Sequence, residues 1–368
     1  MQLKRLSLIN FKNISHEELQ LHEGINCFVG DNGAGKTNLI DAIYYLSMSK
    51  SSLPTTDGQN TLHGNDFFVL EGSYLSSAGK SEQILCSFSR KGANGAKSGK
   101  IIKRNGKEYE RLADHVGLIP VVIVSPADSA LISDAAEERR RYLNGFISQL
   151  EPDYLRSAMR YNTILSERNR LLKISSDEDM LSIYDGQLAR EGETIHRLRQ
   201  RYIEALQPYV ERFYSALSGD REEVSLTYRS ELNDCSMEEL LKQNRQRDLI
   251  NQFTSAGVHR DDLILKIGGY PLRKYGSQGQ QKSFLIALKL AQYALVAQER
   301  REHPILLLDD LFDKLDAGRV TQLLKLVAED EFGQIFISDC NPHRLAETLD
   351  RAGVSYHLFR VKEGAIEQ

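Results

Sequence analysis

Residues 30–37 have the types and the spacing of a phosphate-binding loop. The segment reads GDNGAGKT and fits the pattern G-x-x-x-x-G-K-[ST]. In such a loop the glycines let backbone N–H groups curl around a phosphate, Lys36 neutralises its outer oxygens and the Thr37 hydroxyl can bind Mg²⁺. A glycine-rich turn with an incidental lysine is the weaker interpretation, because a strand pattern precedes the segment and a helix pattern follows it.

A second candidate is an aliphatic run that ends in two acids. Residues 304–310 read PILLLDD. Burying such a strand leaves its first carboxylate at the edge of a sheet, so we expect Asp309 to hold a metal, directly or through water, and Asp310 to orient or deprotonate an attacking water. A buried strand followed by a solvated acidic pair explains this run equally well when it is taken alone. The glycine-rich segment elsewhere in the chain favours the metal-binding interpretation of this run.

The third candidate is the segment 277–282, SQGQQK, just before a long amphipathic helix pattern. Ser277 is a good N-cap residue, and Gly279 lets the backbone approach a ligand, so the start of this helix could receive a phosphate. An ordinary helix cap is the alternative. Only the presence of the two other candidates favours a phosphate-binding role for this segment.

The elements expected around these residues begin with strands. Residues 2–9 alternate polar and apolar, and 25–29 form an apolar run that meets the glycine-rich turn. Apolar residues three and four apart after Lys36 predict a helix. Short alternating runs between about 65 and 125 predict an antiparallel meander, with a mobile hairpin tip at 92–100. Strand, glycine turn and helix therefore follow in the required order.

The middle of the chain predicts helices. Residues from about 135 to 218 contain almost no Gly or Pro, with a break at 174–180. The longer half, about 40 residues, would reach roughly 60 Å, an arm but not a long rod. Strand patterns return at 262–267, and apolar runs at 304–310, 334–339 and 356–361 fit central strands of a covered parallel or mixed sheet. We therefore expect an α/β head built from both chain ends, with a helical insertion.

Composition excludes several classes of protein. The chain has 368 residues, 41% hydrophobic and 27% charged, with a formal net charge of −4, which is typical of a globular protein and leaves room for about two domains. No apolar run is long enough for a membrane span, and residues 1–11 alternate instead of forming a signal peptide, so we expect a cytoplasmic protein without membrane contact. Four scattered cysteines suggest packed thiols rather than disulfides or a zinc site.

In this order and with these separations, the motifs resemble those of the ABC-type ATPase superfamily. The segments LKRLSLINFKN at the start, RRRYLN at 139–144, GVHRDDL at 257–263 and LDDLFDKLD at 308–316 resemble the RecF family of bacterial recombination mediators. The resemblance extends from residue 2 to about 340. It implies an α/β fold with an ABC-type ATPase head of mixed sheets over 1–128 and 256–368, and a mainly helical arm inserted over 129–255.

The resemblance also implies a weak ATPase that uses ATP and Mg²⁺. Lys36, Asp309 and Asp310 would be catalytic, and Thr37 and Asp309 would hold the metal. A head-to-tail homodimer would form on ATP, in which Ser277, Gly279 and Asp316 lie at the interface and complete the partner's site. The residues expected to bind the nucleotide are Lys12, Gly30, Asn32, Gly33, Ala34, Gly35, Lys36, Thr37, Asn38, Ser277, Gln278, Gly279 and Gln280.

Three positions depart from the family pattern. Lys12 follows Asn10-Phe11 where relatives commonly have arginine, so a bidentate contact is lost. The element before the arm reads Ser125-Pro126-Ala127-Asp128, which puts a metal sensor there in doubt. Residues 338–339 are Ser-Asp where transport-type relatives have a histidine, so a histidine switch is not expected.

Two basic segments could contact DNA. Residues 97–111 contain six basic and two acidic residues, net +4, and residues 137–173 contain eight and five, net +3. Solvated faces are the usual explanation of such runs. On a RecF-like frame they predict salt-sensitive, sequence-independent binding. The residues we select are Lys100, Lys103, Arg104, Arg139 and Arg140.

Our leading hypothesis is an ATP-dependent DNA clamp in recombinational repair of single-strand gaps. The resemblance implies RecO and RecR as partners, RecA loading as the outcome and slow hydrolysis. No aromatic-rich sheet typical of single-strand binders is evident, which favours duplex DNA near a gap. The ATPase subunit of a membrane transporter is an alternative, made less favourable by the 240 residues between Lys36 and Ser277. A short SMC-like chromosome-structure head is another, made less favourable by the short arm.

Overall fold

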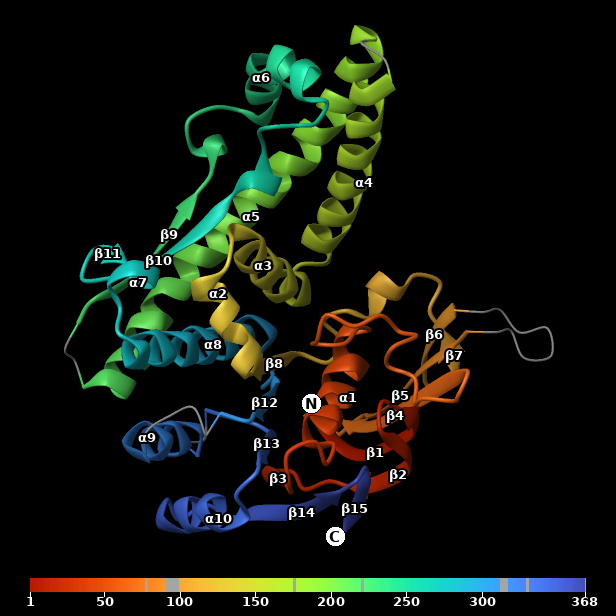
Figure 1. Ribbon diagram of the computed structural model, residues 1–368, viewed down its shortest axis with the longest axis vertical. Helices are drawn as coiled ribbons and strands as arrows, with labels where there is room; N and C mark the ends of the chain where they lie inside the picture. Colours follow the sequence, from red (N-terminus) through yellow and green to blue (C-terminus); the bar gives the residue numbers. More distant parts are fainter. Residues whose placement is uncertain are drawn as a thin grey trace. The chain divides into compact units, whose positions relative to one another are not determined.

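The computed structural model describes residues 1–76, 79–90, 99–174, 177–219, 222–311, 317–328 and 331–367 (Figure 1). Contacts divide the chain into two compact units, Met1–Asp128 with Gln292–Gln368, and Ser129–Ala291. The predicted division into a head of 1–128 with 256–368 and an arm of 129–255 stays a prediction.

A mainly parallel sheet forms one layer of the first unit. Its order is β15-β14-β3-β13-β12-β8, and only the edge strand β15 is antiparallel to its neighbour. Every residue of β3, β12 and β13 is buried, as expected for strands that are apolar on both faces. The strands are β3 (Ile25–Val29), β8 (Val121–Val124), β12 (Ile305–Asp309), β13 (Ile335–Asp339), β14 (Tyr356–Lys362) and β15 (Ala365–Glu367).

An antiparallel sheet forms the second layer, in the order β2-β1-β4-β5-β6-β7. Its strands are β1 (Gln2–Phe11), β2 (Ile14–Gln20), β4 (Phe67–Leu75), β5 (Ser81–Ser89), β6 (Gly99–Arg104) and β7 (Lys107–Glu108). The predicted meander is therefore correct up to β7. It was wrong for β8, which pairs in parallel with β12 because VVIV is apolar throughout. Most of the predicted hairpin tip lies outside the described residues.

Helix α1 (Lys36–Met48) packs against strands of both sheets and shares one hydrophobic core with them. The helix therefore fixes the direction in which the segment before it, 30–35, leaves β3. Helices α9 (Ala317–Val327) and α10 (Pro342–Arg351) contact each other in the same unit. Helix α8 (Gln278–Arg300) begins in the second unit and ends in the first.

The second unit is mainly helical. Helix α5 has 41 residues, which confirms the predicted long helix. It packs along α4, and the predicted break lies between them. The helices of this unit are α2 (Ala130–Ser133), α3 (Ala136–Leu150), α4 (Pro152–Ile174), α5 (Glu178–Ser218), α6 (Met237–Asn251) and α7 (Leu272–Tyr275).

A small antiparallel sheet, β11-β10-β9, completes the second unit. It consists of β9 (Val224–Arg229), β10 (Asp262–Ile267) and β11 (Tyr270–Pro271). The sequence predicted β10 but gave no sign of β9 or α6. Strand β9 falls in the predicted arm and β10 in the predicted head, although the two strands pair along their whole length.

Candidate functional site

The glycine-rich loop connects β3 to α1, and three of its glycines have conformations that favour glycine. Gly33 and Gly35 have φ angles of 83° and 117°. At Gly30 a Cβ atom would lie 2.1 Å from the backbone oxygen of Val361 in β14. The loop therefore depends on glycine for its turns and for its close approach to the neighbouring strand.

Lys36 is the first residue of α1 and is buried. Its ammonium group donates to the backbone oxygens of Gly30 and Asp31 at 2.7 and 2.8 Å. The N–H groups of Asn38 and Leu39 bond back to Gly35. Among the described backbone hydrogen bonds those of Lys36 and Thr37 are not used, as is usual in the first turn of a helix, and the helix dipole favours an anion there.

The two strand ends and the helix start meet at Thr37, Asp309 and Ser338. The Thr37 hydroxyl donates to Asp309 Oδ1 at 3.0 Å, and the Ser338 hydroxyl donates to the same oxygen at 2.6 Å. Two adjacent ligands of an octahedral Mg²⁺ at about 2.1 Å are separated by about 3.0 Å. The Thr37 and Asp309 oxygens thus fit a shared Mg²⁺, which would polarise a bound phosphate and neutralise its charge.

Asp309 is a buried carboxyl group. Burial raises its pKa above the ordinary value, the hydrogen bonds from Ser338 and Thr37 oppose this, and the negative charges of Asp310 and Asp41 add to it. A cation at this carboxylate would remove the cost of holding its charge in the interior. The electrostatics therefore agree with a metal-binding role.

Asp310 has a φ of 47°, in the left-handed region that aspartate tolerates better than most residues. Its N–H donates to the Ser338 hydroxyl at 2.9 Å, so one serine positions both acids. Ser338 is a site residue that sequence reasoning missed, because it considered position 338 only as a place without histidine. Its signal was its position at the end of β13, beside the end of β12.

Asn13, which was not identified from the sequence, forms hydrogen bonds that stabilise the loop. Its side chain accepts from Asn38 Nδ2 at 2.7 Å and donates to the backbone oxygen of Ala34 at 3.2 Å. The N–H of Gly364 donates to the same Ala34 oxygen at 2.8 Å. Asn13 and Gly364 thus hold Ala34 of the loop, and Asn13 also holds Asn38 of α1.

Lys12 does not lie free to contact a phosphate. Its ammonium group is 2.6 Å from Asp41 Oδ2, with the lysine side chain 11% exposed and that of Asp41 1%. Asp41 also accepts hydrogen bonds from Ser51 and Ser52. The structure therefore gives Lys12 an ion-pair partner in Asp41, and its predicted nucleotide contact stays a prediction. Asp41 was not identified from the sequence.

The segment 277–280 forms a capping box at the start of α8. Ser277 Oγ accepts from Gln280 N at 3.3 Å, and Gln280 Oε1 accepts from Ser277 N at 2.6 Å, as predicted for an N-cap serine. Ser277 and Gln278 are exposed, and Gly279 is partly buried. Asp316, the other predicted interface residue, lies outside the described residues.

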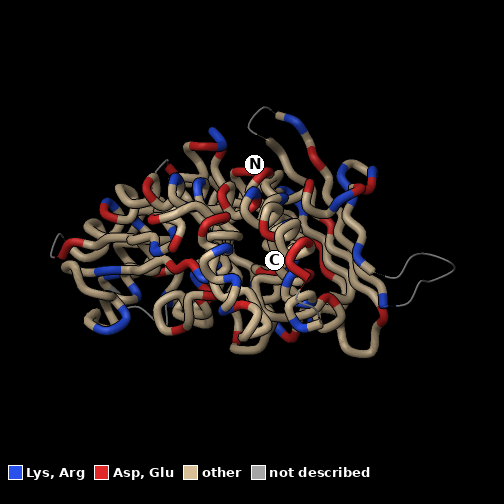
Figure 2. The backbone as a smooth tube through the Cα atoms, turned by 90° about the horizontal axis from the view of Figure 1, so that it is seen from above, with Lys and Arg blue, Asp and Glu red and all other residues tan. Residues whose placement is uncertain are grey.

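Two residues of the first basic segment, Lys100 and Arg104, pair with neighbouring acids. Lys100 pairs with Asp57 at 2.9 Å, and Arg104 pairs with Glu82 at 2.7 Å. Lys103 forms no ion pair within the described part of the chain. Figure 2 shows the same interspersion of basic and acidic segments elsewhere in the chain. Of the selected residues in this segment, Lys103 alone keeps an uncompensated charge.

Two arginines of the second basic segment contact the aspartates of the GVHRDDL segment. Arg139, with 12% of its side chain exposed, pairs with Asp262 at 2.6 Å, and Arg140 donates to the backbone oxygen of Asp261 at 2.8 Å. Arg199, a buried residue of α5, pairs with Asp261 at 2.7 Å. The charge of Arg139 is thus paired inside the unit, and the predicted DNA contact of this residue stays a prediction. Asp261 and Asp262 are thus both buried and engaged in ion pairs.

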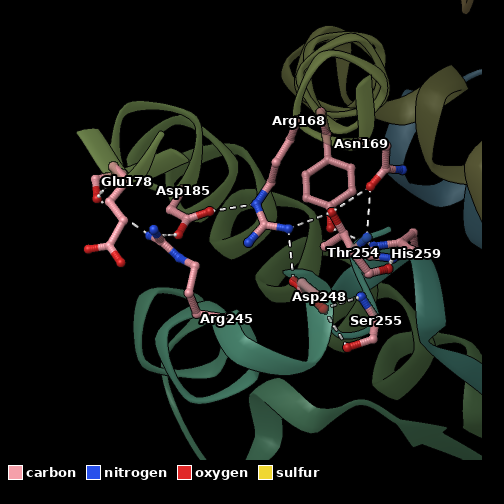
Figure 3. Close-up of polar contacts among 11 residues, drawn as sticks. Arg168, Asn169, Glu178, Asp185, Arg245, Asp248, Thr254, Ser255 and His259 are labelled. Atoms are coloured by element: carbon pink, nitrogen blue, oxygen red, sulfur yellow. Dashed lines mark hydrogen bonds and ion pairs between the residues drawn. The ribbon is translucent and has the colours of Figure 1, made fainter. Parts of the chain in front are cut away.

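The interior of the second unit contains a further buried ion-pair cluster (Figure 3). Arg168, which has no exposed surface, lies 2.6 Å from Asp185 and 2.8 Å from Asp248. The hydroxyl of Thr254 accepts from the same guanidinium at 2.8 Å, and Arg245 pairs with Asp185 from its other side. These contacts tie α4, α5 and α6 together.

His259 is part of this interior. Its Nε2 donates to the backbone oxygen of Thr254 at 3.0 Å, and its Nδ1 accepts from the hydroxyl of Tyr161 at 2.8 Å, which is the arrangement of a neutral ring. Burial lowers the pKa of His259 to about 4. The residue thus has a structural role in the second unit.

Comparisons with known proteins agree with this site. The family described as RecF/RecN/SMC N terminal domain matches residues 2–364. The DNA replication and repair protein RecF of Bacteroides thetaiotaomicron is 46% identical over 370 residues, which cover 100% of this chain and 99% of the relative. That of Flavobacterium johnsoniae is 42% identical over 366 residues, 98% and 100% of the two chains.

Solved structures give the same result. The recombination mediator protein RecF with ATP, in the RecFOR pathway, superposes with a TM-score of 0.88 at 29% identity, covering 100% of this chain and 97% of that one. The Smc head domain of Pyrococcus furiosus, at 13% identity, covers 100% and 95% of the two chains with a TM-score of 0.58, and this likeness concerns the fold alone. No helix within the described residues is both long and apolar enough to span a membrane. The chain belongs to the RecF family and has its ABC-type ATPase fold.

Proposed function

We propose that this chain is an ATP-dependent DNA clamp in recombinational repair. The observation that carries the proposal is the convergence of Lys36, Thr37, Asp309 and Ser338 in a chain of the RecF family. A relative of the same fold has been solved with ATP. Lys36 and the first N–H groups of α1 would hold the phosphates, and Thr37 and Asp309 would hold Mg²⁺.

Hydrolysis would be slow, and the nucleotide would act mainly on assembly. Asp310 would orient or deprotonate the attacking water, and Asp309 beside it would keep the metal. Two copies would pair head to tail, with Ser277 and Gly279 of one copy completing the γ-phosphate site of the other. The exposure of Ser277 at a helix start supports this role.

The pair would hold duplex DNA near single-strand gaps and assist RecA loading together with RecO and RecR. Support comes from the relatives, which are named DNA replication and repair proteins, and from the RecFOR pathway of the solved structures. We also propose the division into an ATPase head, 1–128 with 256–368, and an inserted arm, 129–255.

A pair of matched arginine substitutions tests the cross-subunit role of the 277–280 segment. Ser277→Arg and Ser236→Arg each remove a capping-box serine, from α8 and from α6, and should each cost about 1 kcal/mol of stability. In sedimentation with Mg²⁺ and ATP, only Ser277→Arg should stay monomeric, and both should bind nucleotide. Equal pairing of the two variants would contradict the proposal.

A further inference from the structure

Two exposed tyrosines lie against each other at the end of the small sheet. Tyr270 in β11 is 60% exposed and Tyr275 at the end of α7 is 56% exposed. Their ring centroids are 5.0 Å apart with an interplanar angle of 44°. The two rings contact each other and are still exposed to solvent, so they form an aromatic surface that a ligand can reach.

The backbone holds this pair in place. Gly268 and Gly269 form the two-residue turn between β10 and β11 with φ angles of 54° and 81°, as a tight hairpin turn requires. Leu272, between the two tyrosines, is fully buried, and the N–H of Gly276 donates to its backbone oxygen at 2.9 Å. The rings therefore stand on an anchored segment, so binding a ligand there needs little ordering of the backbone.

The charge around the tyrosines is positive. Residues 263–298 contain five basic residues and no acidic one. Arg273 and Lys274 are exposed and form no ion pair within the described part of the chain, and Lys274 Nζ lies 5.5 Å from the centroid of the Tyr275 ring. Two acids lie just before β9: Glu222, which accepts from Tyr214 and from Gln280, and the exposed Glu223, whose backbone oxygen accepts from the N–H of Gly268 at 2.8 Å.

We propose that Tyr270 and Tyr275 stack on the bases of single-stranded nucleic acid while Arg273 and Lys274 contact its phosphates. Exposed aromatic rings beside uncompensated cations are the physical requirement for sequence-tolerant binding of unpaired bases, because every base has a stacking face and every nucleotide a charge. Duplex DNA keeps its bases stacked inside and cannot use the rings.

This inference deepens the proposed function, on which it rests for the presence of DNA at a gap. It also changes the sequence-based expectation that no aromatic surface for single strands exists. The two tyrosines are separated by a strand end and a short helix, and only the fold places them side by side.

Fluorescence anisotropy of labelled oligonucleotides tests the proposal, with the full chain and without ATP. The probes are an oligothymidine of about 16 nucleotides, an abasic strand of the same length and a blunt duplex, each at about 50 and 200 mM salt. The variants are Tyr270→Ala/Tyr275→Ala and the matched control Tyr270→Phe/Tyr275→Phe. Thermal unfolding and ATP-driven self-association of each variant show whether the fold and the adjacent Ser277 segment are intact.

The wild type should bind oligothymidine at least about tenfold more tightly than the abasic strand, and the alanine variant should lose this preference. The phenylalanine variant should keep it within about twofold, since its rings still stack. An alanine variant with an unchanged preference, or a wild type without one, overturns the proposal. If the alanine variant loses ATP-driven self-association but keeps its preference for oligothymidine over the abasic strand, the tyrosines instead lie between two copies of the chain. If the wild type fails to pair on ATP but prefers bases, the dimer proposal fails and this one stands.

Discussion

Replacement of Asp309 by asparagine separates the metal-binding role of this residue from its role in packing. The amide has the shape of the carboxyl group and keeps an oxygen that can accept from Thr37 and Ser338. It removes the negative charge, which is buried and whose pKa is raised. We expect Asp309→Asn to be at least as stable as the wild type without nucleotide, and to gain almost nothing from Mg²⁺ and ATP.

The size of the effect follows from linkage. A ligand present at roughly 100 times its Kd stabilises the folded state by about 2.7 kcal/mol. For a unit of about 200 residues such as the first one, 1 kcal/mol corresponds to roughly 2–4 °C in Tm. Mg²⁺ and ATP should therefore raise the Tm of the wild type by roughly 5–11 °C, and that of Asp309→Asn by less than about 2 °C.

The pH dependence gives a second measure of the same residue. Because the folded pKa of Asp309 is raised, the folded state binds its proton more readily than the unfolded state. The stability of the nucleotide-free wild type should therefore fall as the pH rises from the ordinary aspartate pKa through the raised one. Asp309→Asn should lack this step.

Scanning calorimetry with Mg²⁺ and ATP, with ATP and a chelator, and without ligand measures these shifts. Asp310→Asn is the control, because the neighbouring acid is expected to serve hydrolysis and not metal affinity, so it should keep most of the gain. An Asp309→Asn protein with the full Mg²⁺-dependent gain in Tm would refute the assignment of the metal to this carboxylate.

Three further predictions concern the interior and the loop. When the pH falls from about 7 to about 5, the free energy of unfolding of the second unit should fall by about 2 kcal/mol. The reason is that His259, with a pKa of about 4 when folded, stays neutral in the folded state while the same histidine is protonated in the unfolded chain. Chemical denaturation at both pH values, for the wild type and for His259→Gln, measures the difference. Arg168→Met should cost about 3–5 kcal/mol by leaving two buried acids short of a partner, and the exposed Arg170→Met less than about 0.5 kcal/mol, in the same assay. Gly30→Ala should lower the free energy of unfolding by about 2–3 kcal/mol and abolish nucleotide binding, because its Cβ would meet a backbone oxygen of β14. At Gly33 a Cβ would meet no such atom, so Gly33→Ala should cost only about 1 kcal/mol. Calorimetry measures both values.

Much of the nucleotide site could be predicted because its parts are local in the sequence. The loop before α1 and the acids after β12 each depend on a short run of residues whose pattern indicates both the element and the chemistry. Ser338 was harder, because a serine at the end of a strand carries no signal until the strand is known to lie beside β12. The parallel pairing of β12 and β13 is a long-range property.

Charge was the feature that the sequence predicted least well. Runs of basic residues at 97–111 and 137–173 suggested open cationic faces, but acids from other elements pair with some of these residues. Glu82 pairs with Arg104, Asp57 with Lys100 and Asp262 with Arg139. The exposed cations at 273–274 form no dense run and were overlooked. Ion pairing depends on tertiary contacts that a local count of charges does not contain.

The most direct test of the account is the molar mass of the wild type at saturating Mg²⁺ and ATP, measured by sedimentation together with the number of nucleotides bound. We predict a dimer with two nucleotides, a monomer without nucleotide, and a monomer under both conditions for Lys36→Ala. A wild-type chain that is saturated with nucleotide and still monomeric would contradict the completion of each site by Ser277 of a second copy.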